Sequence, residues 1–402
     1  MKLSRRLALA SALGSSLAGI APGTFAAHAP KGKSKEKEVP AGSPGETPLG
    51  PVETVAKWAF IQDFTTGAVL LNKGADEAMP PSSMTKLMTM YLVYEQLKKG
   101  QLKLTDTVTV SARAAAMGGS RMFIDVGKPV VIEDLVRGVI VASGNDAATV
   151  LAETVGGSQE KFVDMMNAKA KELGMTHSTF RNPTGWPDPE QFMSCRDIAT
   201  LANRIVKEFP EYYKYESERS FKYNNIEQQN RHPMVQAGTA DGLKTGHTDA
   251  GGFGLVASSS RDGRRMVMVL NGMTSMHERA QESEKLMNWA FGNFENVTLF
   301  SANEVIDNAQ VWLGTDKTVP LTGGRDLVVT LPKSWRQTAS IKISYDAPIK
   351  APVAKGQPVG VLMLRGHGVP AMDVNLIAGA DVPRLSLPMR GLAVVSHFVS
   401  GG

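Results

Sequence analysis

Cysteine is almost absent from this chain of 402 residues, which contains Cys195 and no second cysteine. An intramolecular disulfide is therefore excluded, and the packed core alone must hold the fold together. Cys195 lies between Ser194 and Arg196, and we interpret it as a small buried residue rather than as a nucleophile.

Histidines with metal-ligand spacing are also missing. None of the seven histidines forms a His-x-x-x-His pair, so the sequence predicts no metal site and no cofactor.

Long apolar runs are missing as well, because no segment beyond the N-terminus approaches the roughly 20 apolar residues that a membrane-spanning helix needs.

Net charge is small once the N-terminus is set aside. Of the formal charge of +5, three charges come from Lys2, Arg5 and Arg6 and one from residues 30–50, which leaves +1 for residues 51–402. Nucleic-acid binding depends on a basic surface that meets the phosphate backbone. The nearly neutral remainder therefore excludes nucleic acid from the expected partners.

The first 29 residues have the pattern of a signal peptide. A basic start is followed by an apolar run at 7–20 and by small residues, and cleavage is expected after Ala26, Ala27 or Ala29. This predicts export to the periplasm or cell envelope, with a peripheral place on the outer face of the inner membrane as one option. The alternative is an N-terminal helix that keeps the chain anchored in the membrane.

Residues 30–50 are rich in proline, glycine, serine, lysine and glutamate and contain almost nothing apolar. This composition predicts a flexible linker. We interpret it as a solvated spacer; the alternative is that its lysines touch anionic wall or lipid groups.

Residues 51–296 predict a mixed domain in which helices lie between two strand hairpins. The first hairpin pairs 58–61 with 67–71, and the second pairs 252–258 with 265–270 across an Asp262-Gly263 turn. Helical periodicity is found at 87–97, 132–141, 147–155, 161–173, 198–206 and 278–291.

In residues 297–388 the helical periodicity gives way to short strand-like segments separated by proline and glycine turns. The predicted strands are 311–313, 327–330, 341–343 and 359–362. The pattern predicts a small β-sandwich-like domain, with a structural or spacing role because it contains no cluster of histidine, cysteine or carboxylates. Residues 389–402 form a short C-terminal tail.

Ser83 and Lys86 are the first candidate pair for chemistry. Two prolines precede them and an apolar helical run follows, so the sequence predicts both residues in the first turn of a helix. Residues three apart share one helix face, and the positive end of the helix dipole disfavours a charged ammonium. A neutral amine beside a hydroxyl is what a serine nucleophile requires.

The same spacing also occurs at Ser34 and Ser158, each followed by a lysine at the third place, so spacing alone is not specific. Ser34 lies in the predicted linker, and Ser158 is a predicted helix N-cap. Ser83 differs because two further motifs follow it along the chain.

The second motif, Ser143-Gly144-Asn145, lies in a predicted turn between two helices, where it can project a hydroxyl and an amide into a cleft. The third, Lys244-Thr245-Gly246, precedes the strand at 252–258 and offers a cation and a hydroxyl that suit a carboxylate. The alternatives are an ordinary turn for the second motif and a surface loop for the third.

These three motifs in this order resemble those of the low-molecular-mass penicillin-binding proteins, the D-alanyl-D-alanine carboxypeptidases of serine-peptidase type. The resemblance covers about residues 55–385. It implies an α+β fold: a serine β-lactamase or penicillin-binding-like catalytic domain with an antiparallel sheet and a helical cluster, followed by a small all-β domain. It also implies a peptidoglycan pentapeptide as substrate and β-lactam antibiotics as inhibitors.

The resemblance further implies roles by position. Ser83 corresponds to the nucleophile, Lys86 to its base, and Ser143 to the hydroxyl that relays a proton to the leaving D-alanine. The oxyanion hole would come from the backbone N–H groups of Ser83 and His247. The substrate-binding residues implied are Asn145, Lys244, Thr245, Gly246, His247 and Arg279.

Two departures from the family pattern bear on function. Trp186-Pro187-Asp188-Pro189 stands where relatives often carry a glycine-rich loop, which affects the expected rate and substrate preference. The C-terminal stretch 389–399 is short for a membrane-binding helix, so only a weak contact with a membrane surface is expected.

Two other functions stay open from the sequence. A β-lactamase shares the motifs, but no glutamate is obviously placed for deacylation, and such an enzyme does not need the extra β domain. A non-catalytic wall-binding scaffold would keep the fold, but the intact Ser83 and Lys86 argue against it.

Overall fold

The computed structural model describes residues 43–366 and 368–400 of the chain. The predicted signal peptide and residues 30–42 of the predicted linker lie outside this part. At the described end of the linker, Gly45 pairs with Val52 and Glu46 pairs with Asn72, so this segment lies against a strand of the first domain.

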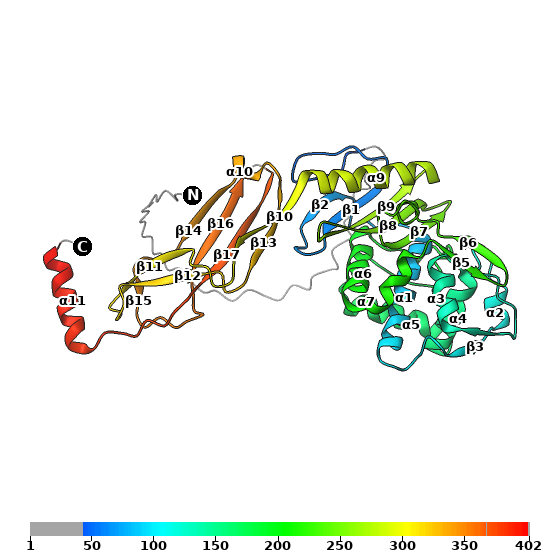
Figure 1. The fold of residues 1–402 in the computed structure, drawn as a ribbon, viewed down its shortest axis with the longest axis horizontal. Coiled ribbons are helices and arrows are strands. Elements are labelled where there is room, and N and C mark those ends of the chain that lie inside the picture. Colours follow the sequence, from blue (N-terminus) through cyan, green and yellow to red (C-terminus); the bar gives the residue numbers. More distant parts are fainter. Residues whose placement is uncertain (1–42, 367, 401–402) are drawn as a thin grey trace, which may run out of the picture. The chain divides into compact units, whose positions relative to one another are not determined.

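The first domain is built on a five-stranded antiparallel sheet in the order β2-β1-β9-β8-β7 (Figure 1). Both predicted hairpins are confirmed, and β1 pairs with β9, which joins them into one sheet. The strands are β1 (Trp58–Asp63), β2 (Val69–Lys73), β7 (Gly242–Thr248), β8 (Gly252–Arg261) and β9 (Arg264–Met273).

The sheet is apolar on both faces because alternate residues of its central strands point to opposite sides. Val256 and Val269 belong to the core shared with the helical cluster, whereas Leu255 and Leu270 belong to a second core that includes residues of α9 (Met276–Asn293). The sheet therefore lies between the helical cluster and α9, as Figure 1 shows.

The helical cluster lies between β2 and β7 in the chain, as predicted. Its long helices correspond to the predicted ones, and short elements that the sequence did not indicate lie between them. The elements are η1 (Ser82–Thr85), α1 (Lys86–Lys98), β3 (Thr107–Thr109), α2 (Ala112–Ala115), β4 (Pro129–Val131), α3 (Ile132–Ile140), α4 (Asn145–Gly156), α5 (Gln159–Glu172), α6 (Cys195–Glu208), α7 (Pro210–Tyr213), η2 (Lys214–Ser217), β5 (Ser220–Tyr223), β6 (Ile226–Gln229) and α8 (Pro233–Ala237). Cys195 is fully buried, as expected.

The C-terminal domain is all-β, as predicted, apart from the short helix α10 (Trp335–Thr338). It contains a two-stranded sheet, β10-β13, and a six-stranded sheet in the order β14-β16-β17-β12-β11-β15. The strands are β10 (Phe294–Phe300), β11 (Asp307–Trp312), β12 (Thr318–Thr322), β13 (Leu327–Pro332), β14 (Ser340–Ser344), β15 (Ile349–Lys350), β16 (Pro358–Gly366) and β17 (Val369–Ala378).

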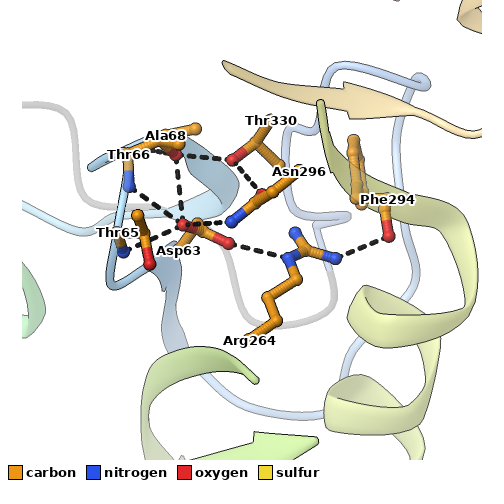
Figure 2. A network of polar contacts seen from close by, with 8 residues as sticks. All are labelled: Asp63, Thr65, Thr66, Ala68, Arg264, Phe294, Asn296 and Thr330. Carbon is orange, nitrogen blue, oxygen red and sulfur yellow. Dashed lines mark hydrogen bonds and ion pairs between the residues drawn. The ribbon is translucent and has the colours of Figure 1, made fainter. Parts of the chain in front are cut away.

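A polar network around Asp63 connects the two domains (Figure 2). The fully buried Asp63 accepts hydrogen bonds from Arg264 Nε at 2.8 Å and from Asn296 Nδ2 at 3.2 Å. Thr330 of β13 donates in turn to Asn296 Oδ1 at 2.8 Å. Asp63 and Arg264 come from β1 and β9, whereas Asn296 and Thr330 come from β10 and β13, so the network links the five-stranded sheet to the all-β domain.

The chain continues into helix α11 (Leu387–Ser400). Within the described residues, none of the helices combines the length and the apolar character that crossing a bilayer requires.

Candidate active site

Ser83 lies on η1, a 3-10 turn that leads directly into α1. The sequence predicted both Ser83 and Lys86 in the first turn of one α-helix, and this is corrected in one respect: Lys86 opens the α-helix and Ser83 precedes it. The turn is tied to the sheet, because the hydroxyls of Ser82 and Thr248 are 2.8 Å apart. The candidate nucleophile therefore lies between the helical cluster and strand β7.

The amine of Lys86 is fully buried and has three polar neighbours. Nζ donates to Asn145 Oδ1 at 2.7 Å and to the carbonyl of Thr184 at 2.6 Å, and it lies 3.0 Å from Ser83 Oγ. A neutral amine has two N–H donors and one lone pair, so these contacts are satisfied if the Ser83 hydroxyl donates to that lone pair.

Electrostatics favour this neutral form. Burial lowers the pKa of Lys86 well below its ordinary value, and the positive charges of Lys244 and Arg231 lower it further. The arrangement can therefore remove a proton from Ser83.

Ser143 lies in the turn between α3 and α4, as predicted, whereas Asn145, which the sequence placed in that turn, is the first residue of α4. Ser143 has a positive φ of 55°, a conformation that presents its buried hydroxyl to the sheet, where Oγ accepts from Lys244 Nζ at 2.9 Å. Asn145 contacts Lys86 through Oδ1 and donates from Nδ2 to the carbonyl of Gly118 at 2.8 Å. The second motif is thus connected to both of the others.

Lys244, Thr245 and Gly246 lie within β7, the edge strand of the sheet. The sequence placed them ahead of a strand, with a surface loop as the alternative, so their strand assignment is a correction. Gly246 is packed closely, because a Cβ atom there would lie 3.0 Å from Ser82 Cβ and 3.3 Å from the amide nitrogen of Ser83. Glycine thus brings the backbone leading into His247 close to the Ser83 amide, an arrangement that can hold an oxyanion.

The side chain of His247 is exposed, and its ring lies 3.9 Å from that of Phe253. Thr245 is buried, and its carbonyl accepts from Lys244 Nζ at 3.1 Å. Burial, together with the nearby Arg231, lowers the pKa of Lys244 to about 7.

Arg279 extends from α9 and is 5% exposed. It donates from Nη2 to the carbonyl of Arg231 at 3.2 Å, while its buried Nε has no hydrogen-bond partner among the described residues. Burial and the charge of Arg231 lower its pKa to about 10. Mutually repelling cations at one site favour an anionic ligand, which would relieve the repulsion.

Arg231 is a cation that the sequence reasoning missed. Its Nη1 donates to Ser120 Oγ at 2.6 Å, and its charge lowers the pKa values of Lys86, Lys244 and Arg279. The residue lies outside all three motifs, so no local signal marked it.

Two supporting groups were also missed. Asp146, at the start of α4, accepts from the backbone N–H groups of Met122 and Phe123 at 3.0 Å each, and so fixes the segment next to Ser120. Thr184 contributes its carbonyl to Lys86 from a loop about a hundred residues away in the chain. In the described part of the chain, no group of three or more histidine, cysteine or carboxylate side chains could hold a metal ion.

Known proteins match the chain over both domains. A sequence model of the D-alanyl-D-alanine carboxypeptidase family matches residues 45–274, and one of the penicillin-binding protein 5 C-terminal domain matches residues 294–384. The D-alanyl-D-alanine carboxypeptidase DacC of Escherichia coli K12 is 39% identical over 320 residues, which cover 77% of this chain and 80% of the relative.

Solved structures agree with these matches. Penicillin-binding protein 5 of Haemophilus influenzae is 35% identical, with a TM-score of 0.73 over 84% of this chain and 100% of its own. Penicillin-binding protein D2 of Listeria monocytogenes, solved in an ampicillin-bound form, is 25% identical, with a TM-score of 0.54 over 59% of this chain and 97% of its own.

Proposed function

The chain belongs to the D-alanyl-D-alanine carboxypeptidase family, and on that premise we propose that it removes the terminal D-alanine of peptidoglycan stem peptides through an acyl-enzyme on Ser83. One observation carries the proposal: the buried amine of Lys86 lies 3.0 Å from Ser83 Oγ and uses its two donors on other groups. Because the pKa of Lys86 is strongly lowered, this amine acts as the base.

Acylation then follows from the contacts of the site. Lys86 takes the proton of Ser83 as Oγ attacks the carbonyl carbon of the peptide bond between the two D-alanines. The backbone N–H groups of Ser83 and His247 hold the oxyanion of the tetrahedral intermediate, and one such donor contributes about 10² to 10³ in rate. As the C–N bond breaks, Ser143 passes a proton to the leaving amine, and Lys244, which donates to Ser143 Oγ, replaces that proton. In the second half of the reaction, the oxygen of a water molecule bonds to the acyl carbon as the bond to Ser83 Oγ breaks. Lys86 returns its proton to Oγ, and the proton released by the water restores that of Lys244.

Substrate recognition rests on the cations opposite Ser83. Lys244, Thr245 and Arg279 hold the carboxylate of the terminal D-alanine, and Arg231 adds positive charge from the same side. Asn145 holds the amide of the peptide. A cationic site of this kind selects a free C-terminus, so the enzyme trims peptide ends and does not cut internal bonds.

β-Lactams are the second class of ligand proposed for Ser83. The ampicillin-bound form of the Listeria relative supports this assignment. We expect this acyl-enzyme to turn over slowly, as a carboxypeptidase rather than a β-lactamase would.

The experiment that tests the proposal is incubation with a labelled penicillin, beside an assay for D-alanine release from a pentapeptide. We expect a long-lived adduct and D-alanine release from the native protein, and neither from Ser83→Ala. Rapid turnover of the drug would favour a β-lactamase. Binding of wall peptide without adduct or cleavage would favour a scaffold.

We also propose an exported protein divided into a signal peptide (1–29), a linker (30–50), a catalytic domain (51–296), a small β-sandwich-like domain (297–388) and a tail (389–402). The all-β domain would act as a spacer. A weak contact of α11 with the membrane surface is supported by its exposed apolar residues, Leu387, Met389, Leu392 and Val395. Sedimentation with anionic phospholipid vesicles, with and without residues 387–402, tests that contact.

A further inference from the structure

Asn271 is a fully buried amide side chain in a strand that is otherwise apolar at this point. In β9 it directly follows the run 266–270, in which every residue is apolar and fully buried. Its Oδ1 has no hydrogen-bond partner within residues 43–366 and 368–400. An unpaired buried oxygen destabilises a folded protein, so an apolar side chain would suit the core better. The presence of an amide here therefore calls for another explanation.

A β-bulge directs Asn271 toward the turn that carries the candidate nucleophile. Two residues of β9, Asn271 and Gly272, stand opposite the single residue Gly254 of β8. A Cβ atom on Gly254 would lie 2.5 Å from Asn271 Oδ1, so the glycine leaves the space that the amide occupies. Bulges of this kind re-aim a side chain, and they are over-represented beside active sites.

The amide of Asn271 holds the segment just before Ser83. Its Nδ2 donates to the carbonyl of Pro80 at 3.1 Å and to Met79 Sδ at 3.2 Å. Pro80 and Pro81 have no backbone N–H group, so neither can donate to the sheet, and the segment must be held through its carbonyl oxygens. Asn271 supplies such a contact three residues before the nucleophile.

The turn needs this support because its backbone is strained. Ser82 has a φ of 50°, in the left-handed region that is unfavourable for a residue with a side chain. A conformation of this kind persists only where the surrounding structure holds it. The Thr248 hydroxyl holds the side chain of Ser82 at 2.8 Å, and Asn271 holds the backbone two residues earlier.

We propose that Asn271 is a positioning residue for the nucleophile. Through the Pro80 carbonyl it keeps the strained turn in the conformation that places Ser83 Oγ 3.0 Å from Lys86 Nζ. This inference rests on the proposed function, because it concerns the rate at which Ser83 is acylated. The unpaired Oδ1 is the loss of stability that accompanies a donor at this place. Asn271 thus contributes to the reaction rather than to the free energy of folding.

The test separates reactivity from stability in Asn271→Leu, whose side chain has a similar branched shape and no polar atom. We expect the melting temperature to equal or exceed that of the native protein, since the unpaired oxygen is gone. The maximal rate of Ser83 acylation by a labelled penicillin should fall about tenfold to a hundredfold, because a displaced nucleophile reacts slowly. The dissociation constant of the drug before acylation should stay at the native value, since Lys244 and Arg279 lie outside the turn.

Two further variants keep the test decisive. Asn271→Ala removes the donor without adding volume and should show the same loss of acylation, even if leucine disturbs the packing. Ser259→Ala is the matched control. Ser259 is a fully buried polar residue toward the other end of β8, and its Oγ donates to the Thr239 carbonyl at 2.7 Å. Its replacement should lower the melting temperature and leave the acylation rate unchanged.

A native maximal rate in both Asn271 variants would overturn the proposal, whether or not the drug binds more weakly. If acylation slowed in every variant that melts at a lower temperature, Ser259→Ala included, Asn271 would be an ordinary part of the core, and the proposal would be overturned as well. If the native protein formed no adduct on Ser83, the proposed function itself would fail, and that result differs from slow acylation in a variant of a reactive protein.

Discussion

Lys86 Nζ lies 3.0 Å from Ser83 Oγ, within reach for the neutral amine to take the proton of the serine. Asn145 and the Thr184 carbonyl take the two N–H groups of the neutral amine. The neighbours of Lys86 thus orient the base as well as lowering its pKa.

Replacing Lys86 by alanine should slow acylation by a labelled penicillin by about 10² to 10⁴. Lys99→Ala, just beyond the end of the same helix and well exposed, is the control and should react at the native rate. Because the base works in its neutral form, the native rate should fall as the pH drops through the pKa of Lys86, which burial holds well below its ordinary value. Native-like acylation of Lys86→Ala would contradict the assignment of the base.

Arg279→Ala should weaken cleavage of peptides with a free C-terminus by about tenfold to a hundredfold, since a charge-assisted contact to the carboxylate is lost. Acylation by small esters, which lack that carboxylate, should be spared. Lys285→Ala on the same helix is the control, because Lys285 is 53% exposed and pairs with Glu282, which is not a residue of the site. A comparable loss on peptides and esters would remove the role given to Arg279.

Glu216→Gln should change the pH dependence of peptide cleavage. Glu216 is buried and accepts from the Tyr94 hydroxyl at 3.0 Å, and its Oε2 has no hydrogen-bond partner in the part of the chain described. Burial raises the pKa of Glu216 to about 7, and its negative charge partly offsets the lowering of the Lys244 pKa.

Without that charge, Lys244 should lose its proton at a lower pH. If the protonated Lys244 binds the substrate carboxylate, the alkaline limb of kcat/KM for free-ended peptides then moves to lower pH in Glu216→Gln. Glu218→Gln, which removes a partner of Arg137, serves as the control. An unmoved alkaline limb would show that Glu216 does not act on Lys244.

Gly185→Ala should slow acylation of Ser83 far more than its modest effect on the melting temperature would suggest. Gly185 has a positive φ of 82°, and a Cβ atom there would overlap the carbonyl oxygen of Ser82. The displaced turn should slow acylation by about 10²-fold, as expected for a misplaced reacting group. Gly157→Ala is the matched control: φ is 73°, but an added Cβ would meet no atom of the described chain within 4 Å.

Both glycine variants should lower the melting temperature, because alanine disfavours a positive φ by about 1 kcal/mol. Only Gly185→Ala should also lose acylation. Equal acylation rates in the two variants would show that the contact with Ser82 has no bearing on the reaction.

Asp63→Ala should lower the free energy of unfolding by about 3–5 kcal/mol in urea titrations, because Arg264 would keep a buried, unpaired charge. The Asp63–Arg264 pair is 0% and 12% exposed. Asp373→Ala breaks the Arg365–Asp373 pair, which is 44% and 58% exposed, and should change stability by no more than about 1 kcal/mol. Equal effects would mean that the network in Figure 2 adds little to stability.

The local features of the fold were predictable because local interactions produce them. The hairpin of β8 and β9 follows from alternating apolar residues around Asp262 and Gly263, both of which have the positive φ that such a turn requires. Strand β7 was not predicted, because its segment from Lys244 to His247 lacks an alternating apolar pattern. Its strand form comes from pairing with β8.

The sequence by itself determined which reactive groups this protein has and which of them are close together. Ser83 and Lys86 are neighbours in any compact turn, because only two residues separate them. Tertiary structure alone decided the rest: Ser143 meets Lys244, Thr184 meets Lys86, and Arg231 adds its charge to the site. These groups come from distant segments, and their meeting depends on how the helical cluster packs on the edge of the sheet, which no local pattern encodes.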